Sequence, residues 1–347
     1  MKSTPALQQV PPEVRCAADY EAQARSRMDP AAWAYFAAQA GDGATGRANR
    51  AGWDDLALWP RVLRPLAGLN LDTQLLGRSW PTPLLVAPMA QQHLAHPDAE
   101  LATALAAAAQ GVGLVLSTQS TTPLEAVAKA VRDEPGRGPL WLQLYFQGGR
   151  DATLERVRQA EAAGFEALVL TVDASVRASR PGAPGAATSP AASLQDLLEQ
   201  APTWDDVAWL QGEARLPLLL KGVLHPADAL EAARLKVAGL IVSNHGGRTI
   251  ASAPATAVAL PRIADAVGDS LPLLVDGGIR SGGDILKALA LGARGVLIGR
   301  PILHGLATAG AMGVAHVLRL LADELRLAMA QCGLRHPGEA GRDLLQG

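Results

Sequence analysis

The chain has 347 residues, of which 49% are apolar and 18% charged, and its formal net charge is −2. This length suits two average domains or one large α/β barrel. A charge so close to neutral provides no basic field for binding nucleic acid or an anionic membrane. The two cysteines, Cys16 and Cys332, fit neither a metal-binding spacing nor a disulfide framework, so no metal site is expected.

The first 80 residues precede the first predicted strand and contain a helical stretch at residues 29–42. The N-terminus carries prolines where a signal peptide would have its apolar core. Residues 101–116 are the most apolar segment, but their interruptions indicate a helix leading into a strand, not a membrane span. We therefore expect a cytoplasmic protein that does not bind membranes, with an N-terminal helical extension over residues 1–80.

Eight short apolar runs follow, at residues 83–88, 112–117, 140–145, 166–173, 217–222, 239–244, 272–278 and 295–301. Segments with helical spacing separate many of them, at residues 98–111, 122–133, 151–164, 225–239 and 281–293. Near-continuous apolar strands that alternate with helices are typical of a parallel sheet buried on both faces. Eight such units favour an α/β fold of the TIM type, a closed (β/α)8 barrel over residues 81–347.

Two further segments lie outside this alternation. Residues 181–203 are rich in proline, alanine and serine and form the longest irregular connection, which indicates a lid or a disordered loop. Residues 313–333 have the pattern of an amphipathic helix, with Gly333 at a plausible C-terminal cap.

Polar side chains stand at the ends of seven of the eight predicted strands. In a (β/α)8 barrel the C-terminal ends of all strands meet at one rim, where catalytic residues gather. Each residue also has a structural interpretation, since Asp173 could cap a helix and Tyr145 could simply pack. Polar residues at seven of eight strand ends are, however, not expected by chance. Lys221 directly follows three leucines, and a lysine is rarely buried without a partner. The pattern therefore indicates an active site.

Glycine-rich turns follow the last two strands, as "DGGIRSGGD" at residues 276–284 and "IGRP" at residues 298–301. Barrels build phosphate sites there from backbone N–H groups and a helix N-terminus. Arg280 and Arg300 can add bidentate contacts to a phosphate. No G-x-G-x-x-G motif follows an early strand, so a mononucleotide cofactor is favoured over a dinucleotide.

These motifs, together with "SNHGGR" (243–248), "LKGV" (220–223), "QLY" (143–145), "LTVD" (170–173) and "LAHPDAE" (94–100), resemble the FMN-dependent α-hydroxy acid oxidases and dehydrogenases over about residues 20–335. The resemblance implies an FMN cofactor and oxidation of a small L-2-hydroxy acid, such as lactate, glycolate or mandelate, to the 2-oxo acid. It also implies reoxidation of the flavin by O2 with release of H2O2, and a homo-oligomer, a tetramer or octamer.

The resemblance also assigns roles to individual residues. The catalytic and substrate-binding set would be Tyr35, Gln119, Tyr145, Asp173, Arg180, Lys221, His245 and Arg248. Within it, His245 would be the base and Asp173 its partner, because a nearby carboxylate stabilises the imidazolium. The FMN-binding set would be Ala87, Pro88, Ala90, Ser117, Gln143, Thr171, Lys221, Ser243, Asp276, Gly278, Arg280, Gly299 and Arg300.

The chain departs from the family pattern at Gln39, Ser179 and Ala251, and it has Gln119 where an aromatic residue is common. Three alternatives therefore stay open: a dehydrogenase that uses another electron acceptor, an FMN barrel with non-redox chemistry, and a flavin-binding barrel without turnover. The order of proton removal, from the hydroxyl or from the α-carbon, also stays open.

Overall fold

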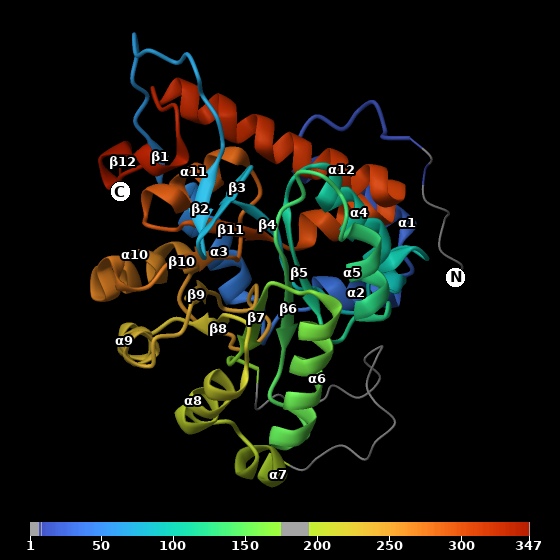
Figure 1. The fold of residues 1–347 in the computed structure, drawn as a ribbon. Helices are drawn as coiled ribbons and strands as arrows, with labels where there is room; N and C mark the ends of the chain where they lie inside the picture. The colour runs from blue at the N-terminus through green and yellow to red at the C-terminus, as the bar shows by residue number, and fades with distance from the viewer. Residues whose placement is uncertain (1–6, 8, 175–193, 347) are drawn as a thin grey trace.

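The structure is a computed structural model that describes residues 7, 9–174 and 194–346. Within these residues, eight parallel strands close into a barrel in the order β10-β11-β4-β5-β6-β7-β8-β9 (Figure 1). The strands are β4 (Leu84–Val86), β5 (Gly113–Ser117), β6 (Leu140–Leu144), β7 (Ala167–Thr171), β8 (Leu218–Val223), β9 (Gly239–Val242), β10 (Leu273–Val275) and β11 (Gly295–Ile298). Seven of them lie within the predicted apolar runs, and β8 extends one residue beyond its run, to Val223, so the predicted (β/α)8 fold is confirmed.

The barrel interior is a packed apolar core separate from the layer under the helices. Its inward-facing residues come from every strand: Leu85, Val115, Trp141, Val169, Leu219, Ile241, Leu274 and Leu297. A hairpin of β2 (Thr73–Leu75) and β3 (Arg78–Trp80) closes the N-terminal end, where Trp80 meets Trp141 edge-to-face at 5.3 Å between ring centroids. The hairpin covers this end of the packed interior, so we expect the active site at the opposite, C-terminal end of the strands.

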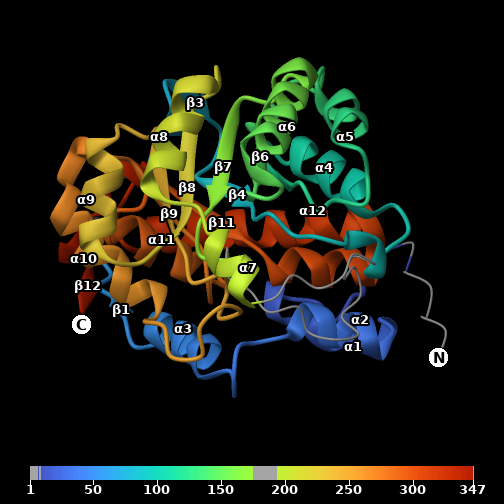
Figure 2. The same cartoon turned by 90° about the horizontal axis from the view of Figure 1, so that it is seen from below.

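Helices surround the barrel on its outer face (Figures 1 and 2). They are α4 (Ala99–Ala109), α5 (Leu124–Val131), α6 (Gly149–Ala163), α7 (Leu194–Glu199), α8 (Trp204–Glu213), α9 (Pro226–Arg234), α10 (Thr256–Val267), α11 (Gly282–Ala290) and α12 (Arg300–Gln331). Short 3-10 helices are η1 (Ala17–Asp19), η2 (Gln92–Leu94), η3 (Gly268–Ser270), η4 (Pro337–Glu339) and η5 (Arg342–Leu344). The five helices predicted between strands are confirmed; α6 begins two residues earlier than predicted, and the other four are shorter than predicted.

Three segments differ from the sequence-based expectation. The predicted irregular connection 181–203 contains α7, so the prediction is wrong there, and residues 181–193 lie outside the described residues. Helix α10 carries Pro261 in its interior, which masks its helical pattern because proline normally breaks a helix. The predicted helix at 313–333 begins earlier, at Arg300, and non-helical backbone at 309–310 kinks it.

The N-terminal extension shares the apolar layer between the barrel and its helices. Its helices are α1 (Tyr20–Arg27), α2 (Pro30–Ala37) and α3 (Ala44–Asp54), and all three lie on one side of the barrel (Figure 2). Tyr20, Phe36 and Trp53 are buried in the same apolar cluster as the outward-facing strand residues. After α3, β1 (Ala57–Leu58) pairs antiparallel with β12 (Leu345–Gln346), which ties the extension to the C-terminal end of the chain.

Among the described residues, α12 is long and apolar enough to meet the length and composition criteria for crossing a membrane. However, 61% of its most apolar window is buried inside the molecule, against α4, α1 and α11. A core helix meets the same two criteria, so α12 is no indication of a membrane span.

Candidate active site

A pocket of about 990 Å³, part of it open to solvent, lies at the C-terminal ends of the barrel strands. Seventeen predicted site residues line it: Tyr35, Ala87, Pro88, Ala90, Ser117, Gln119, Gln143, Tyr145, Thr171, Lys221, His245, Arg248, Asp276, Gly278, Arg280, Gly299 and Arg300. Asp173 and Ser243 do not line the pocket but are hydrogen-bonded to His245 and Lys221, which do. Arg180 lies outside the described residues. The convergence of eight strand ends on one pocket is therefore confirmed.

Seven further lining residues were not predicted: Phe36, Met89, Gly246, Gly277, Ile279, Leu297 and Leu303. Met89, Gly246, Gly277 and Ile279 lie between predicted residues, so extending each motif by one position would have found them. The others are apolar residues whose sequence setting does not differ from that of ordinary core residues.

His245 and Asp173 form a buried pair across the strand ends. His245 Nδ1 lies 3.0 Å from Asp173 Oδ1, and their side chains are only 17% and 11% exposed. Burial lowers the pKa of His245, an effect that the bond to Asp173 only partly offsets. The imidazole is therefore neutral near pH 7, with Nδ1–H donating to the carboxylate and a lone pair on Nε2. His245 has a φ of +56°, a strained conformation for a non-glycine residue, as often found at functional sites.

Gly222 makes room for this pair. It sits at a β-bulge between Lys221 and Val223 with a φ of +107°, and a Cβ atom there would lie 2.5 Å from Cβ and Cγ of Asp173. Only glycine accepts this conformation without strain. The "LKGV" motif thus places Asp173 behind His245 through its glycine.

Lys221 is the buried cation of the site. Its Nζ lies 3.1 Å from Asp276 Oδ2 and 2.8 Å from Ser243 Oγ. Burial would lower the pKa of Lys221, but Asp276 and Asp173 outweigh it and raise the pKa. The lysine therefore stays protonated and faces the pocket. The hydroxyl of Ser243 also accepts the backbone N–H of His245 at 3.0 Å.

The structure gives Ser243 a place behind the pocket wall. Its side chain is fully buried and does not line the pocket, and its hydroxyl oxygen accepts bonds from Lys221 and His245. Ser243 therefore orients two pocket residues, and its direct bond to a flavin stays a prediction.

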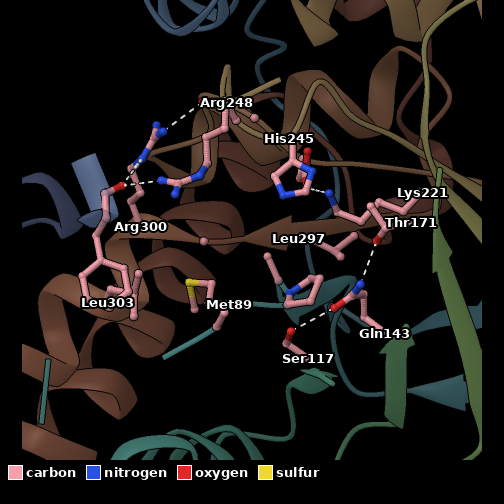
Figure 3. A pocket seen from close by; sticks show the side chains of 18 of the residues that line it. Met89, Ser117, Gln143, Thr171, Lys221, His245, Arg248, Leu297, Arg300 and Leu303 are labelled. Atoms are coloured by element: carbon pink, nitrogen blue, oxygen red, sulfur yellow. Dashed lines mark hydrogen bonds and ion pairs between the residues drawn. The ribbon is translucent and has the colours of Figure 1, made fainter. Parts of the chain in front are cut away.

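A hydrogen-bonded chain crosses three neighbouring strand ends at the pocket floor (Figure 3). Ser117 Oγ donates to Gln143 Oε1 at 2.9 Å, and Gln143 Nε2 donates to Thr171 Oγ1 at 3.1 Å. All three side chains are almost fully buried. Because each hydrogen bond fixes the orientation of the next side chain in the chain, the pocket floor presents its polar atoms in fixed directions.

The opposite wall carries Arg248 above the end of α2. Its Nη1 donates to the carbonyls of Tyr35, Phe36 and Ala38 at 3.0, 3.1 and 3.3 Å, and its guanidinium lies 5.5 Å from the Tyr35 ring centroid. These contacts hold the guanidinium beside the pocket. Gln119, in contrast, is exposed at the pocket's edge.

Arg280 and Arg300 give the pocket an uncompensated positive end. Arg280 donates to the carbonyl of Ile279 and Arg300 to that of Gly246, at 3.2 and 2.9 Å. In the described ranges 9–174 and 194–346 no carboxylate forms an ion pair with either one. Burial, with the neighbouring Arg280 and Arg248, lowers the pKa of Arg300 to about 10. Two crowded guanidinium groups at the N-terminus of α12 call for an anion such as phosphate.

The other polar atoms of this region also fit a phosphorylated flavin. Asp276 Oδ1 is buried and has no hydrogen-bond partner among the residues that the structure describes, as an acceptor for a ribityl hydroxyl would be. Gly277 and Gly278, with φ of +94° and +82°, keep the adjoining wall free of side chains. The pocket thus offers an anion site, an acceptor and a buried lysine, in the arrangement that an FMN-sized cofactor needs.

Comparisons with known proteins agree with this interpretation. The sequence model of one family, described as FMN-dependent dehydrogenase, matches residues 24–186 and 182–347. An L-lactate oxidase of Alicycliphilus denitrificans is 46% identical over 97% of this chain and 97% of its own length. The 2-hydroxyacid oxidase 1 of Homo sapiens is 37% identical over 94% of each chain. A crystal structure of mandelate oxidase with (S)-2-phenylpropionate superposes with a TM-score of 0.84 at 37% identity, over 95% of this chain and 97% of the other. With a pocket suited to FMN and matches over nearly its whole length, the chain belongs to the FMN-dependent dehydrogenase family.

Proposed function

We propose that the protein oxidises a small L-2-hydroxy acid to the 2-oxo acid with FMN, and that O2 reoxidises the flavin. The observation that carries this proposal is the neutral His245, held by Asp173, in the same pocket as Arg248 and the positive end formed by Arg280 and Arg300. The activity named for the relative at 46% identity, L-lactate oxidase, supports lactate as the first substrate to test.

FMN, when bound, accepts the two electrons that the oxidation releases. The chain's own part in proton transfer falls to His245, because Nδ1 is engaged by Asp173 and Nε2 carries the lone pair. The base therefore takes a substrate proton on Nε2, and Asp173 stabilises the imidazolium that forms.

Substrate binding falls to the wall beside His245. The guanidinium of Arg248 matches the two oxygens of a carboxylate, and its bonds to the end of α2 fix its direction. Tyr35 and Tyr145 line the same pocket and supply phenol groups for hydrogen bonds to the substrate. The predicted carboxylate contact of Arg180 remains a prediction.

Cofactor binding uses the floor and the positive end. Arg280, Arg300 and the N-terminus of α12 would hold the phosphate, and Asp276 the ribityl chain. Ala87, Pro88 and Ala90 would back the ring system, and the Ser117–Gln143–Thr171 chain would bond its polar edge. Lys221 would stabilise negative charge there, which is worth about 3 kcal/mol if it resembles an oxyanion donor.

Anaerobic mixing of the FMN-loaded protein with lactate, glycolate and mandelate tests this function. We expect bleaching of the flavin absorbance by at least one of them, followed by recovery and H2O2 on admission of O2. Bleaching that O2 does not reverse would show a dehydrogenase that needs another acceptor. A bound flavin that no hydroxy acid bleaches would refute the proposal and leave non-redox or lost activity.

We also propose that the protein is a homo-oligomer. Trp59, Val62 and Leu63 are 53%, 79% and 100% exposed, although backbone bonds from Trp59 to Leu344 and from Arg61 to Gln331 fix their segment. An ordered apolar surface of this kind is typical of a subunit contact. Sedimentation should show a multimer that Leu63→Asp weakens, and a monomeric wild type would refute the idea. The cytoplasmic location stays a prediction.

A further inference from the structure

We propose that helix α3 clamps the loop after β10 and that Arg50 is a positioning residue for the ribityl-phosphate arm of the cofactor. The inference rests on FMN binding in the proposed function, and it concerns a residue that does not line the pocket. Through Arg50, the N-terminal extension would act on cofactor binding indirectly, by holding residues that line the pocket.

Arg50 joins α3 to the loop through one buried carboxylate. Its Nη1 donates to the carbonyl of Gly278 at 2.6 Å and to Asp284 Oδ2 at 2.7 Å, while Nη2 donates to Asp284 Oδ1 at 2.8 Å. Asp284 is 2% exposed and also accepts the backbone N–H groups of Arg280 and Ser281, at 2.9 and 3.2 Å. A bidentate pair thus fixes both the carbonyl of Gly278 and the backbone of Arg280, and these two residues line the pocket.

The neighbouring turns of α3 contact the same loop at Gly277 and Gly278, and they also contact the segment after β9. Trp53 Nε1 donates to the carbonyl of Gly277 at 2.8 Å. The amides of Asn49 and Asn244 bond to each other at 2.8 and 2.7 Å, which links α3 to the residue before His245. The carbonyl of Asn49 lies so close to Gly278 that a Cβ atom there would be 2.6 Å away.

The loop needs such support because of its own sequence. Gly277 and Gly278 both have left-handed φ values, and glycine loses more conformational freedom on ordering than any other residue. The loop separates Asp276, the partner of Lys221, from Arg280 at the phosphate end. Without α3, those two groups would not be held at a fixed separation when the cofactor binds. Arg50, 228 residues earlier in the chain than Gly278, supplies that constraint.

Electrostatics keeps the clamp closed near neutral pH. Burial would raise the pKa of Asp284, but Arg50 and the backbone N–H of Arg280 outweigh it and lower the pKa. Arg50 has its pKa raised, first by Asp284. Both groups therefore stay charged, and the pair does not depend on the presence of a ligand.

The test compares Arg50→Gln with Arg47→Gln, a matched control on the same helix. Arg47 pairs with Asp42 in the open, with side chains 66% and 72% exposed. We would titrate the FMN-free proteins with FMN and follow the quenching of flavin fluorescence. Losing a charge-assisted hydrogen bond corresponds to about a tenfold change in an equilibrium constant. We therefore expect the Kd for FMN to rise about tenfold in Arg50→Gln and to stay unchanged in Arg47→Gln.

Two further readouts separate positioning from general damage. Amide exchange of residues 277–284 should accelerate in folded, FMN-free Arg50→Gln but not in the control. At saturating FMN, the KM for the hydroxy acid should match wild type, because His245 and Arg248 are untouched. If Arg50→Gln does not fold, Trp53→Phe replaces it, with an expected weakening of about threefold from one neutral hydrogen bond.

The outcomes are distinct. Equal FMN affinity in wild type and the folded α3 variant would overturn the clamp, whatever the enzyme oxidises. Weaker binding in Arg50→Gln alone would support it even if no hydroxy acid were turned over, in which case only the proposed reaction fails. A wild-type protein that does not bind FMN would overturn both.

Discussion

Replacing Asp173 with asparagine tests the proton chemistry most directly. In the native pair, His245 Nδ1 and Asp173 Oδ1 are 3.0 Å apart and mostly buried. Only the Nδ1–H tautomer can donate to the carboxylate, so Nε2 is the basic nitrogen. In Asp173→Asn the amide nitrogen can donate to Nδ1 and favour the opposite tautomer, which puts a proton on Nε2 and removes the base.

The size of the effect follows from the same distance. Two unit charges 3 Å apart attract by about 5 kcal/mol at an effective dielectric constant of about 20. If roughly half of the imidazolium charge has developed in the transition state, about 2.5 kcal/mol is lost, or about 10²-fold in rate. The change of tautomer adds to this, so we expect a fall between about 10²- and 10⁴-fold, the usual range for general base catalysis.

The assay is the rate of flavin bleaching by lactate under anaerobic stopped flow, measured against pH. Since burial lowers the pKa of His245 and Asp173 opposes this, the acid limb in wild type should lie below the ordinary 6.5, and in Asp173→Asn lower still. FMN affinity should not change. A variant that bleaches at the wild-type rate would refute the assignment of His245 as the base.

Three other substitutions test separate parts of the structure. Gly222→Ala should slow bleaching by pushing Asp173 away and should destabilise the fold by at least about 1 kcal/mol. The control is Gly164→Ala, where φ is +88° and the space is open, so that only the strain of a left-handed backbone should arise. Equal bleaching rates in both variants would argue against a positioning role of Gly222. Arg300→Gln should reduce the preference for FMN over riboflavin in binding titrations, because Arg280 alone remains at the phosphate end, and an unchanged preference would argue against this phosphate site. Burial lowers the pKa of His304 to about 3, so between pH 6.5 and 3 only the unfolded chain takes up that proton. The free energy of unfolding should therefore fall by about 1.4 kcal/mol for each unit by which the pH decreases in this range. His304→Phe should flatten this slope in urea unfolding of the FMN-free protein, and an unchanged slope would refute the reasoning.

The barrel was predictable because its signals are local. Each strand is a short apolar run such as 140–145 or 239–244, and each confirmed helix carries its own periodicity. The prediction failed where a local signal misleads, since Pro261 obscures α10 and the composition of 181–203 hides α7. A proline inside a helix and a helix of only six residues both lack the longer periodic pattern on which such a prediction depends.

The site was predictable as a set but not as an arrangement. Strand ends and the family motifs named most of the residues that line the pocket, and Asp173 was expected beside His245. Three features were not expected: the bonds of the Ser243 hydroxyl to Lys221 and His245, the bulge at Gly222, and the contacts of Arg50 with the loop after β10. Each depends on atoms that come within about 3 Å only after the chain has closed on itself.

By itself the sequence determined eight βα units with polar residues after the strands, and parallel closure requires those ends to share one rim. Only the tertiary structure decided which polar groups meet: His245 with the carboxylate of Asp173, and Lys221 with the oxygens of Ser243 and Asp276. It also brought Arg280 and Arg300 together, with no carboxylate paired to either one in the part of the chain that the structure describes. The physical reason is that hydrophobic periodicity is set along the chain, whereas hydrogen bonds and pKa values in the site depend on distances between residues that can be 72 or 195 positions apart.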